Sequence, residues 1–418
     1  MHQTDTSRNS NQEQLDSMDS SYVLLSSSEM AEFVLSYPSV SPISLVNNDV
    51  VWDNTIEDDT AIGKFEIWST DSTPAPFKPV RNRPLGICEW TLYFDAKGCL
   101  TSNFNDIRLE IFRGGIEEQI RKEVYPFLLD VYSLSSSTLE RDRIKVSNRS
   151  SYISFLNQWQ AELEHQKSTK TTVIQENLFR IEKDVVRTDR IFYDDPSTST
   201  ILHQNDPGCI INQNAKLTQL RNILMTYTTS FPFGEPMFVQ GMADLASCLL
   251  ITLEDESDAF WCFVGLMERM KSNFYEDGSG IRRQLHLLKS ILLLLDKPLY
   301  SKFEELDSLH LFCSFRWLLV LFRREFTLKD CQIIWDACFS DYYGPDTHIF
   351  ISVAIFQIYR NEIILNIDDG DDLLKFIHSL SMNLSVDRVL AKTEEVILLF
   401  QRLKGVQLTV SRSISGYF

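Results

Sequence analysis

Two segments of the sequence carry side chains whose types could act together on a phosphoryl group. Residues 178–190, LFRIEKDVVRTDR, place Arg187 three residues after Asp184 in a run without glycine or proline. Residues 236–250, PMFVQGMADLASCLL, present Gln240 just ahead of an apolar helix. An arginine can stabilise the charge on a phosphoryl group in transfer, and a glutamine can hold the attacking water. Together they would supply what a slow GTPase lacks.

Both segments are predicted to be helical, and the helices would set the positions of these side chains. Asp184 and Arg187 lie about one turn apart, where a carboxylate can hold a guanidinium by an i, i+3 pair. Such a pair is more often a solvated surface feature, so by itself it does not establish a site. The apolar positions after Gln240 predict a buried helix face rather than a ligand site: Met242, Leu245, Leu249 and Leu250.

The remainder of the chain also shows mainly helical periodicity. Residues 116–131 form one apolar face in which Pro126 is expected to introduce a kink, and residues 139–167 form a long polar helix. Residues 194–214 are expected to be a surface loop, and Gly114-Gly115 a turn at the start of a helix. Further helices are predicted at 215–229, 240–253, 257–274, 279–294, 309–324, 328–339, 344–364, 371–381 and 384–402. Because strand-type alternation is nearly absent, the predicted fold class is all-α.

The charge balance restricts the class of partner. The chain has 58 acidic and 40 basic residues, a formal net charge of -18. This excess of carboxylates argues against nucleic acid or an anionic membrane surface as the main partner, since both are bound through lysine and arginine. The N-terminus lacks the apolar core of a signal peptide, and the longest apolar runs are too short to cross a bilayer. We therefore expect a cytoplasmic protein without a transmembrane segment.

The sequence offers little for a metal, a cofactor or a bound nucleotide. Its eight cysteines contain no C-x-x-C pair, which favours reduced buried thiols over a metal or redox site. The histidines do not have the H-E-x-x-H spacing of a zinc enzyme, and there is no phosphate-binding loop or dinucleotide fingerprint. We therefore expect neither a metal nor a cofactor.

Residues 1–80 have the composition of a disordered tail, rich in Ser, Asp and Asn with five prolines between Pro38 and Pro79. Within this tail, Tyr22 is the first and Leu25 the last residue of an aromatic-x-x-aliphatic motif, which follows an acidic residue and serines. Motifs of this kind add a strand to the edge of autophagy-type ubiquitin-like proteins. A chance occurrence of the four-residue pattern is the competing interpretation.

Several motifs in a fixed order resemble the TBC domain, the catalytic domain of Rab GTPase-activating proteins. The I-x-x-D-x-x-R motif is matched by Ile181, Asp184 and Arg187, and the Y-x-Q-G-M motif by residues 238–242, followed by Asp244. Further matches are Glu89-Trp90, residues 111–116, Arg121 ahead of 127–129, residues 258–263, 315–319, 324–326 and 334–336. The sequences of residues 181–190 and 112–123 are most similar to those of family members that act on late-endosomal or vacuolar Rabs.

The resemblance implies a two-lobed helical domain over residues 81–405, with the catalytic motifs in 178–250, a C-terminal lobe over about 255–405 and a short tail at 406–418. It implies that Arg187 and Gln240 act in trans on a GTP-bound Rab that carries its own GTP and Mg²⁺. Ile181, Asp184, Phe238, Gly241 and Asp244 would support them. It also implies peripheral association with endosomal or other vesicle membranes.

The chain departs from the family pattern near these motifs. Phe238 stands where the family usually has a tyrosine, and Tyr125 where a tryptophan is usual. The missing hydroxyl at position 238 leaves open a second interpretation, a Rab-binding adaptor with weakened catalysis. A purely structural helical scaffold is a third, but it would leave the ordered motifs unexplained.

Overall fold

The computed structural model describes residues 79, 81–165, 173–188, 207–230, 238–275 and 277–414, with side chains described as far as residue 403. The tail predicted for 1–80 lies outside these residues except for Pro79, and so does the motif of Tyr22 and Leu25 within it. Within them the chain forms helices, and the only strand-like pairings are isolated bridges between Leu85 and Ile116 and between Phe94 and Leu100. The predicted all-α class is confirmed.

The described part of the chain is built from helices. In chain order they are α3 (Ile87–Leu92), α4 (Phe104–Gly114), η1 (Glu118–Ile120), α5 (Arg121–Leu128), α6 (Thr138–His165), α7 (Val173–Thr188), α8 (Pro207–Asn212), α9 (Ala215–Ser230), α10 (Met242–Leu253), α11 (Glu256–Met270), η5 (Lys271–Phe274), α12 (Ser279–Leu295), α13 (Lys297–Glu305), η6 (Phe312–Ser314), α14 (Phe315–Leu319), α15 (Leu328–Phe339), α16 (Thr347–Ile358), α17 (Arg360–Asn366), α18 (Gly370–Ser379) and α19 (Val386–Ile414).

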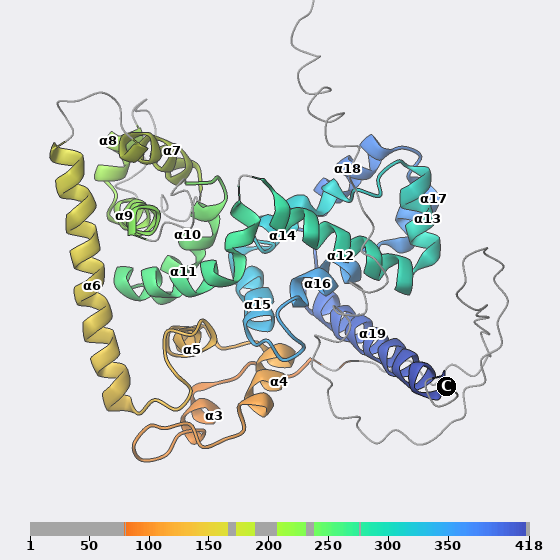
Figure 1. Cartoon of the computed structure of the whole chain (residues 1–418), viewed down its shortest axis with the longest axis horizontal. Helices are drawn as coiled ribbons and strands as arrows, with labels where there is room; N and C mark the ends of the chain where they lie inside the picture. The colour runs from red at the N-terminus through yellow and green to blue at the C-terminus, as the bar shows by residue number, and fades with distance from the viewer. Residues whose placement is uncertain are drawn as a thin grey trace, which may run out of the picture.

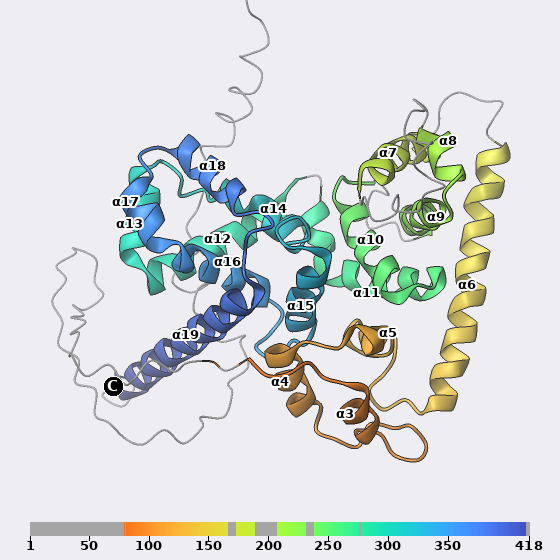
Figure 2. The same cartoon turned by 180° about the vertical axis from the view of Figure 1, so that it is seen from behind.

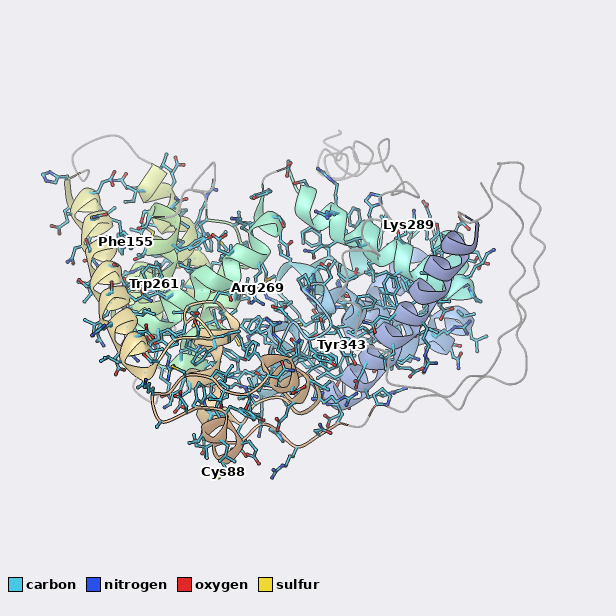
Figure 3. All side chains as sticks on the ribbon, turned by 60° about the horizontal axis from the view of Figure 1, so that its bottom comes forward. Cys88, Phe155, Trp261, Arg269, Lys289 and Tyr343 are labelled. Atoms are coloured by element: carbon cyan, nitrogen blue, oxygen red, sulfur yellow. The ribbon has the colours of Figure 1, made fainter. Side chains whose placement is uncertain are left out.

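The first lobe consists of α6 to α11 (Figure 1). α7, α8 and α9 pack on one another, and α10 packs against α7, α9 and α11. The long helix α6 lies at the outer edge of the lobe, where it covers α9 and α11. Figure 3 labels Phe155 on α6 and Trp261 on α11, and the Trp261 indole N–H donates to the Asn148 carbonyl of α6 at 2.9 Å. These contacts hold the helices that carry the candidate residues.

The second lobe consists of α12 to α19 (Figure 2), in which α16 packs along α19 and α12. Aromatic side chains fill its centre: the rings of Trp317 and Phe303 lie 5.2 and 5.1 Å from that of Phe356. Phe350 and Phe400 contribute a second pair with centroids 5.3 Å apart. Large buried aromatics of this kind dominate core energetics. The tryptophans at 317 and 335 are therefore core residues.

A buried polar network joins the segment α3 to α5, which lies below both lobes in Figures 1 and 2, to α15. Arg121 of α5 pairs with the fully buried Asp336 at 2.9 Å, and the Ile116 N–H donates to the same carboxylate at 2.9 Å. The Tyr125 hydroxyl donates to Asp336 Oδ1, also at 2.9 Å. Burial raises the pKa of the Tyr125 phenol well above its usual value, so it stays a donor. Tyr125 thus uses a hydroxyl that a tryptophan would lack.

The helix predicted for 309–324 is wrong, because a turn interrupts it. η6 and the five-residue α14 end at Leu319, after which Leu321 and Phe322 adopt left-handed φ values of 47° and 60°. Left-handed backbone costs about 1–2 kcal/mol at each non-glycine residue. Burial of Phe322, which is fully enclosed, and of Leu321 offsets this cost. The reversed turn then aims Arg324 at the first lobe.

Other boundaries differ from the prediction for local reasons. The segment expected as one helix at 344–364 is divided into α16 and α17, which are bent by 54°. Residues 207–212, placed in the predicted loop, form α8, and α13 was not predicted. Gly114 and Gly115 end a helix instead of starting one: Gly114 is the last residue of α4 and Gly115 is its C-cap, with φ at 75°. A Cβ at Gly114 would lie 2.2 Å from the Arg83 carbonyl oxygen. α19 extends to Ile414, beyond the end predicted at residue 402.

No single helix in the described part of the chain is long and apolar enough to cross a membrane; α16 and α17 reach that length only as a bent pair, and α16 is mostly buried.

The eight cysteines are all free, and five of them are buried. Burial raises the pKa of the Cys313 thiol to about 12, whereas Cys88 is exposed at the outer end of the α3 segment (Figure 3). The prediction of reduced, buried thiols holds for the buried five.

We expect Arg121→Ala to lower the free energy of unfolding by about 3–5 kcal/mol, because it leaves the Asp336 carboxylate buried without its cation. Tyr125→Phe removes one hydrogen bond and should cost about 1 kcal/mol. Urea unfolding followed by circular dichroism measures both. Lys122→Ala is the control, since Lys122 is 53% exposed; a loss for Lys122→Ala as large as that for Arg121→Ala would contradict the assignment.

Candidate functional site

Arg187 lies near the C-terminal end of α7, on the face turned to solvent. The opposite face of α7 is anchored by burial of Ile174, Ile181 and Val185 against the first lobe. Asp184 is also buried, with 3% of its side chain exposed, whereas 55% of the Arg187 side chain is exposed. The Arg187 Nε and Nη2 groups donate to Asp184 Oδ1 at 2.8 and 2.5 Å. The i, i+3 pair predicted from the sequence therefore orients a guanidinium that remains accessible.

Asp184 also contacts the segment that carries Gln240. Its second oxygen, Oδ2, accepts a hydrogen bond of 3.5 Å from the Gly241 N–H. The Gln240 side chain is exposed, while Gly241 beside it is buried. One carboxylate on α7 thus holds Arg187 with one oxygen and the residue next to Gln240 with the other. The two candidate residues, 53 positions apart in sequence, are brought to the same place.

The residue before this contact is held in a similar way. The Phe238 N–H donates to Asn177 Oδ1 of α7 at 3.4 Å, and the Phe238 ring is buried. Because the attachment uses backbone N–H groups and an apolar ring, it needs no hydroxyl at position 238. The departure from tyrosine therefore leaves the described anchors of the Gln240 segment in place.

Gly241 is required by the geometry of the turn into α10. It is the N-cap of the helix with φ at 106°, a conformation that residues with a Cβ rarely adopt. A Cβ here would lie 3.0 Å from Val320 Cγ1 of the second lobe. The Gln240 backbone therefore passes close to the turn that follows α14.

Asp244, in the first turn of α10, pairs with Arg324, a residue whose role the sequence did not predict. Its carboxylate receives two hydrogen bonds from Arg324, from Nε at 3.0 Å and from Nη2 at 2.9 Å. The Asp244 side chain is 5% exposed and that of Arg324 is 40% exposed. Planar bidentate pairs are among the stronger ionic contacts in proteins. This pair ties the helix behind Gln240 to the second lobe.

The turn that presents Arg324 is itself held by hydrogen bonds from several elements. The Trp335 indole N–H donates to the Leu321 carbonyl at 2.8 Å, and the Ser381 hydroxyl donates to the Arg324 carbonyl at 2.6 Å. Arg316 pairs with the buried Glu325 at 2.7 Å. The described site therefore rests on α7, on the N-terminus of α10 and on this turn. The pairing of residues 80 positions apart has no local signal in the sequence.

Comparison with known proteins decides the family. The family model for the Rab-GTPase-TBC domain matches residues 118–364, more than half of the chain. The chain belongs to this family. Within the matched Rab-GTPase-TBC domain lie Ile181, Asp184, Arg187, Gln240 and the Asp244 to Arg324 pair, so the site described above is part of the domain.

Curated relatives and a solved structure agree with this membership. The chain is 34% identical over 357 residues to the GTPase-activating protein gyp7 of Schizosaccharomyces pombe, covering 85% of this chain and 47% of the relative. It is 34% identical over 309 residues to TBC1 domain family member 17 of Mus musculus, covering 73% and 45%. It spans about half the length of these relatives. The crystal structure of the Ypt/Rab-GAP domain of Gyp1p shares the fold, with a TM-score of 0.61, 20% identity, and coverage of 76% of this chain and 98% of that one.

Gly241→Ala is expected to lower the free energy of unfolding by about 2 kcal/mol or more, because the left-handed strain adds to a contact with Val320. Gly278→Ala is a matched control: its φ is also positive, at 63°, but the nearest atom to a new Cβ is 3.9 Å away. Only the conformational cost of about 1 kcal/mol applies there. Chemical denaturation of both variants tests this; equal losses would show that the approach to Val320 is not limiting.

Proposed function

We propose that this chain accelerates GTP hydrolysis by a GTP-bound Rab, with Arg187 and Gln240 both acting in trans. The observation that supports this most is the division of one buried carboxylate, Asp184, between the Arg187 guanidinium and the Gly241 N–H. An arginine and a glutamine are thereby presented from one rigid point, with both side chains exposed to a partner. The name of the gyp7 relative, a GTPase-activating protein, agrees with this proposal.

The two side chains would have different roles in the reaction. Arg187 would place its positive charge against the phosphoryl oxygens as negative charge develops in the transition state. Gln240 would orient the attacking water through its amide. The GTPase would bring GTP and Mg²⁺, and the chain itself would contribute no cofactor. An arginine supplied in trans contributes on the order of 10³ to 10⁵ in rate in GTPases of this kind.

The carboxylate of Asp184 would act by restricting the guanidinium. A long arginine side chain loses rotamer freedom when it engages a partner, and that loss opposes binding. Two hydrogen bonds from Arg187 to Asp184 restrict the side chain before the GTPase arrives. Preorganised charge of this type needs little rearrangement during the reaction.

A Rab-binding adaptor with weakened catalysis is the second candidate. The observation that favours it is Phe238, whose buried ring places no hydroxyl beside Gln240. In this case the same helical surface would bind the GTPase without positioning the water. The late-endosomal and vacuolar Rabs suggested by the sequence are the first partners to test under both proposals, and vesicle association would follow from such partners.

Arg187→Ala is expected to reduce Rab-stimulated GTP hydrolysis by on the order of 10³ or more, and Gln240→Ala by a smaller factor of about 10². Single-turnover hydrolysis by a panel of purified GTP-loaded Rabs measures this. Arg143→Ala is a matched control, an exposed arginine on α6 in the first lobe. Acceleration by wild type that survives Arg187→Ala would contradict the proposal. Binding without any acceleration would favour the adaptor.

Asp184→Asn should lower the stimulated rate by about 10², because the neutral amide holds the guanidinium less firmly and misplaces it. If Asp184 acts through Arg187, the double variant with Arg187→Ala should be no slower than Arg187→Ala alone, since residues that act as a unit are not additive. The same assay measures this. Multiplicative losses in the double variant would show that Asp184 also acts through the Gln240 segment, where its second oxygen accepts a hydrogen bond from the Gly241 N–H.

A further inference from the structure

The solvent face of α7 carries more than Arg187. Phe179, Lys183 and Arg187 are spaced four residues apart and form one continuous row, which we term the α7 ridge. All three residues are exposed. Residues four apart on a helix are neighbours on its surface, and eight residues span about 12 Å of helix axis. The ridge therefore leads directly from Phe179 to the candidate catalytic arginine.

Phe179 is an exposed aromatic residue on a helix whose other face is well buried. Its side chain has a relative exposure of 57%, and the Lys183 ammonium lies 3.9 Å from the centre of its ring. By contrast, Ile181 and Val185 of the same helix are completely buried. A single exposed apolar residue needs no explanation by itself. The position of Phe179 in the row that ends at Arg187 is what gives it significance.

The charge of this face also differs from that of the chain. The exposed positions of α7 include the cations Arg180, Lys183 and Arg187 against one carboxylate, Glu176. The whole chain has a net charge of -18. A local positive field beside an aromatic anchor is complementary to a partner that presents negative charge, as a GTPase does at its nucleotide phosphates.

We propose that the α7 ridge is a docking surface for the same GTP-bound GTPase, with Phe179 as its apolar anchor and Lys183 as its electrostatic contact. This inference rests on the proposed function, because the ridge is assigned its occupant by continuity with Arg187. A standard interface buries about 800 Å² on each partner, which corresponds to a patch roughly 30 Å across. A GTPase centred near Arg187 covers Phe179 within such a patch.

Within the ridge, Phe179 and Lys183 contribute to binding and not to the chemical step, which belongs to Arg187. Phe179 lies two turns from Arg187, about 12 Å along the axis, and carries no group that could transfer a proton or stabilise charge. Aromatic anchors account for a large share of binding energy at protein interfaces. Loss of the ring therefore weakens the complex while the rate within the complex is retained.

The test uses the Rab that the wild-type chain stimulates most. Single-turnover GTP hydrolysis is measured at increasing concentrations of the full chain, so that the half-saturating concentration reports binding and the saturated rate reports turnover. Phe179→Ala should raise the half-saturating concentration at least tenfold, with the saturated rate within twofold of wild type. Phe179→Tyr, which keeps the ring, should remain close to wild type. Lys183→Glu should raise the half-saturating concentration more strongly at low salt than at high salt, because charge steering is screened by ions.

Two controls bracket these variants. Val146→Ala removes an exposed apolar side chain of 71% relative exposure from α6, away from the ridge, and should change nothing. Arg187→Ala should lower the saturated rate, the opposite pattern to Phe179→Ala. Binding of each variant to the same Rab loaded with a non-hydrolysable GTP analogue, measured by interferometry, provides a readout that does not need catalysis.

The outcomes distinguish the two proposals. Normal stimulation with unchanged half-saturation in both Phe179→Ala and Lys183→Glu overturns the docking surface and leaves the catalytic proposal standing. A second outcome is that the wild-type chain binds a Rab but stimulates none, and that Phe179→Ala abolishes this binding. That outcome supports the docking surface and overturns the catalytic proposal. A wild-type chain that neither binds nor stimulates any Rab of the panel overturns both.

Discussion

The arrangement of the site depends on one buried carboxylate. Asp184 is almost completely enclosed, and a charge in that position must be compensated by donors. The donors come from two places: the Arg187 guanidinium, one turn along α7, and the Gly241 N–H at the start of α10. Because a carboxylate has two oxygens, it can satisfy both at once. The requirement to compensate the charge is therefore also what brings the two candidate residues together.

The second lobe completes this arrangement from the opposite side. Asp244 receives both hydrogen bonds of Arg324, and Arg324 is presented by a turn with two left-handed residues. Backbone strain of this kind persists only where surrounding contacts determine the conformation. Burial of Phe322 and the Trp335 hydrogen bond provide such contacts. The Gln240 segment is thus held by the first lobe through Asp184 and by the second through Arg324.

The buried network around Asp336 gives the lower segment a comparable role. Arg121, Tyr125 and the Ile116 N–H converge on one carboxylate of α15. Complete burial raises the pKa of the Asp336 carboxyl, while Arg121 and the other donors act in the opposite direction. α15 is consequently joined to the segment that precedes the first lobe. The polar clusters around Asp184 and around Asp336 each connect parts of the chain that are far apart in sequence.

The sequence by itself determined the helical class, most helix positions and the spacing that pairs Asp184 with Arg187. Helical periodicity and i, i+3 pairing are local properties, so the contact between Asp184 and Arg187 could be predicted from their spacing alone. The tertiary structure decided what distant residues do to one another. Only the fold shows that Asp184 also holds Gly241, that Arg324 pairs with Asp244, and that residues 320–323 form a turn where local propensity favours a helix. The physical reason is that burial of Phe322 and compensation of buried charges are long-range terms, which override local preference and leave no periodic signal in the sequence.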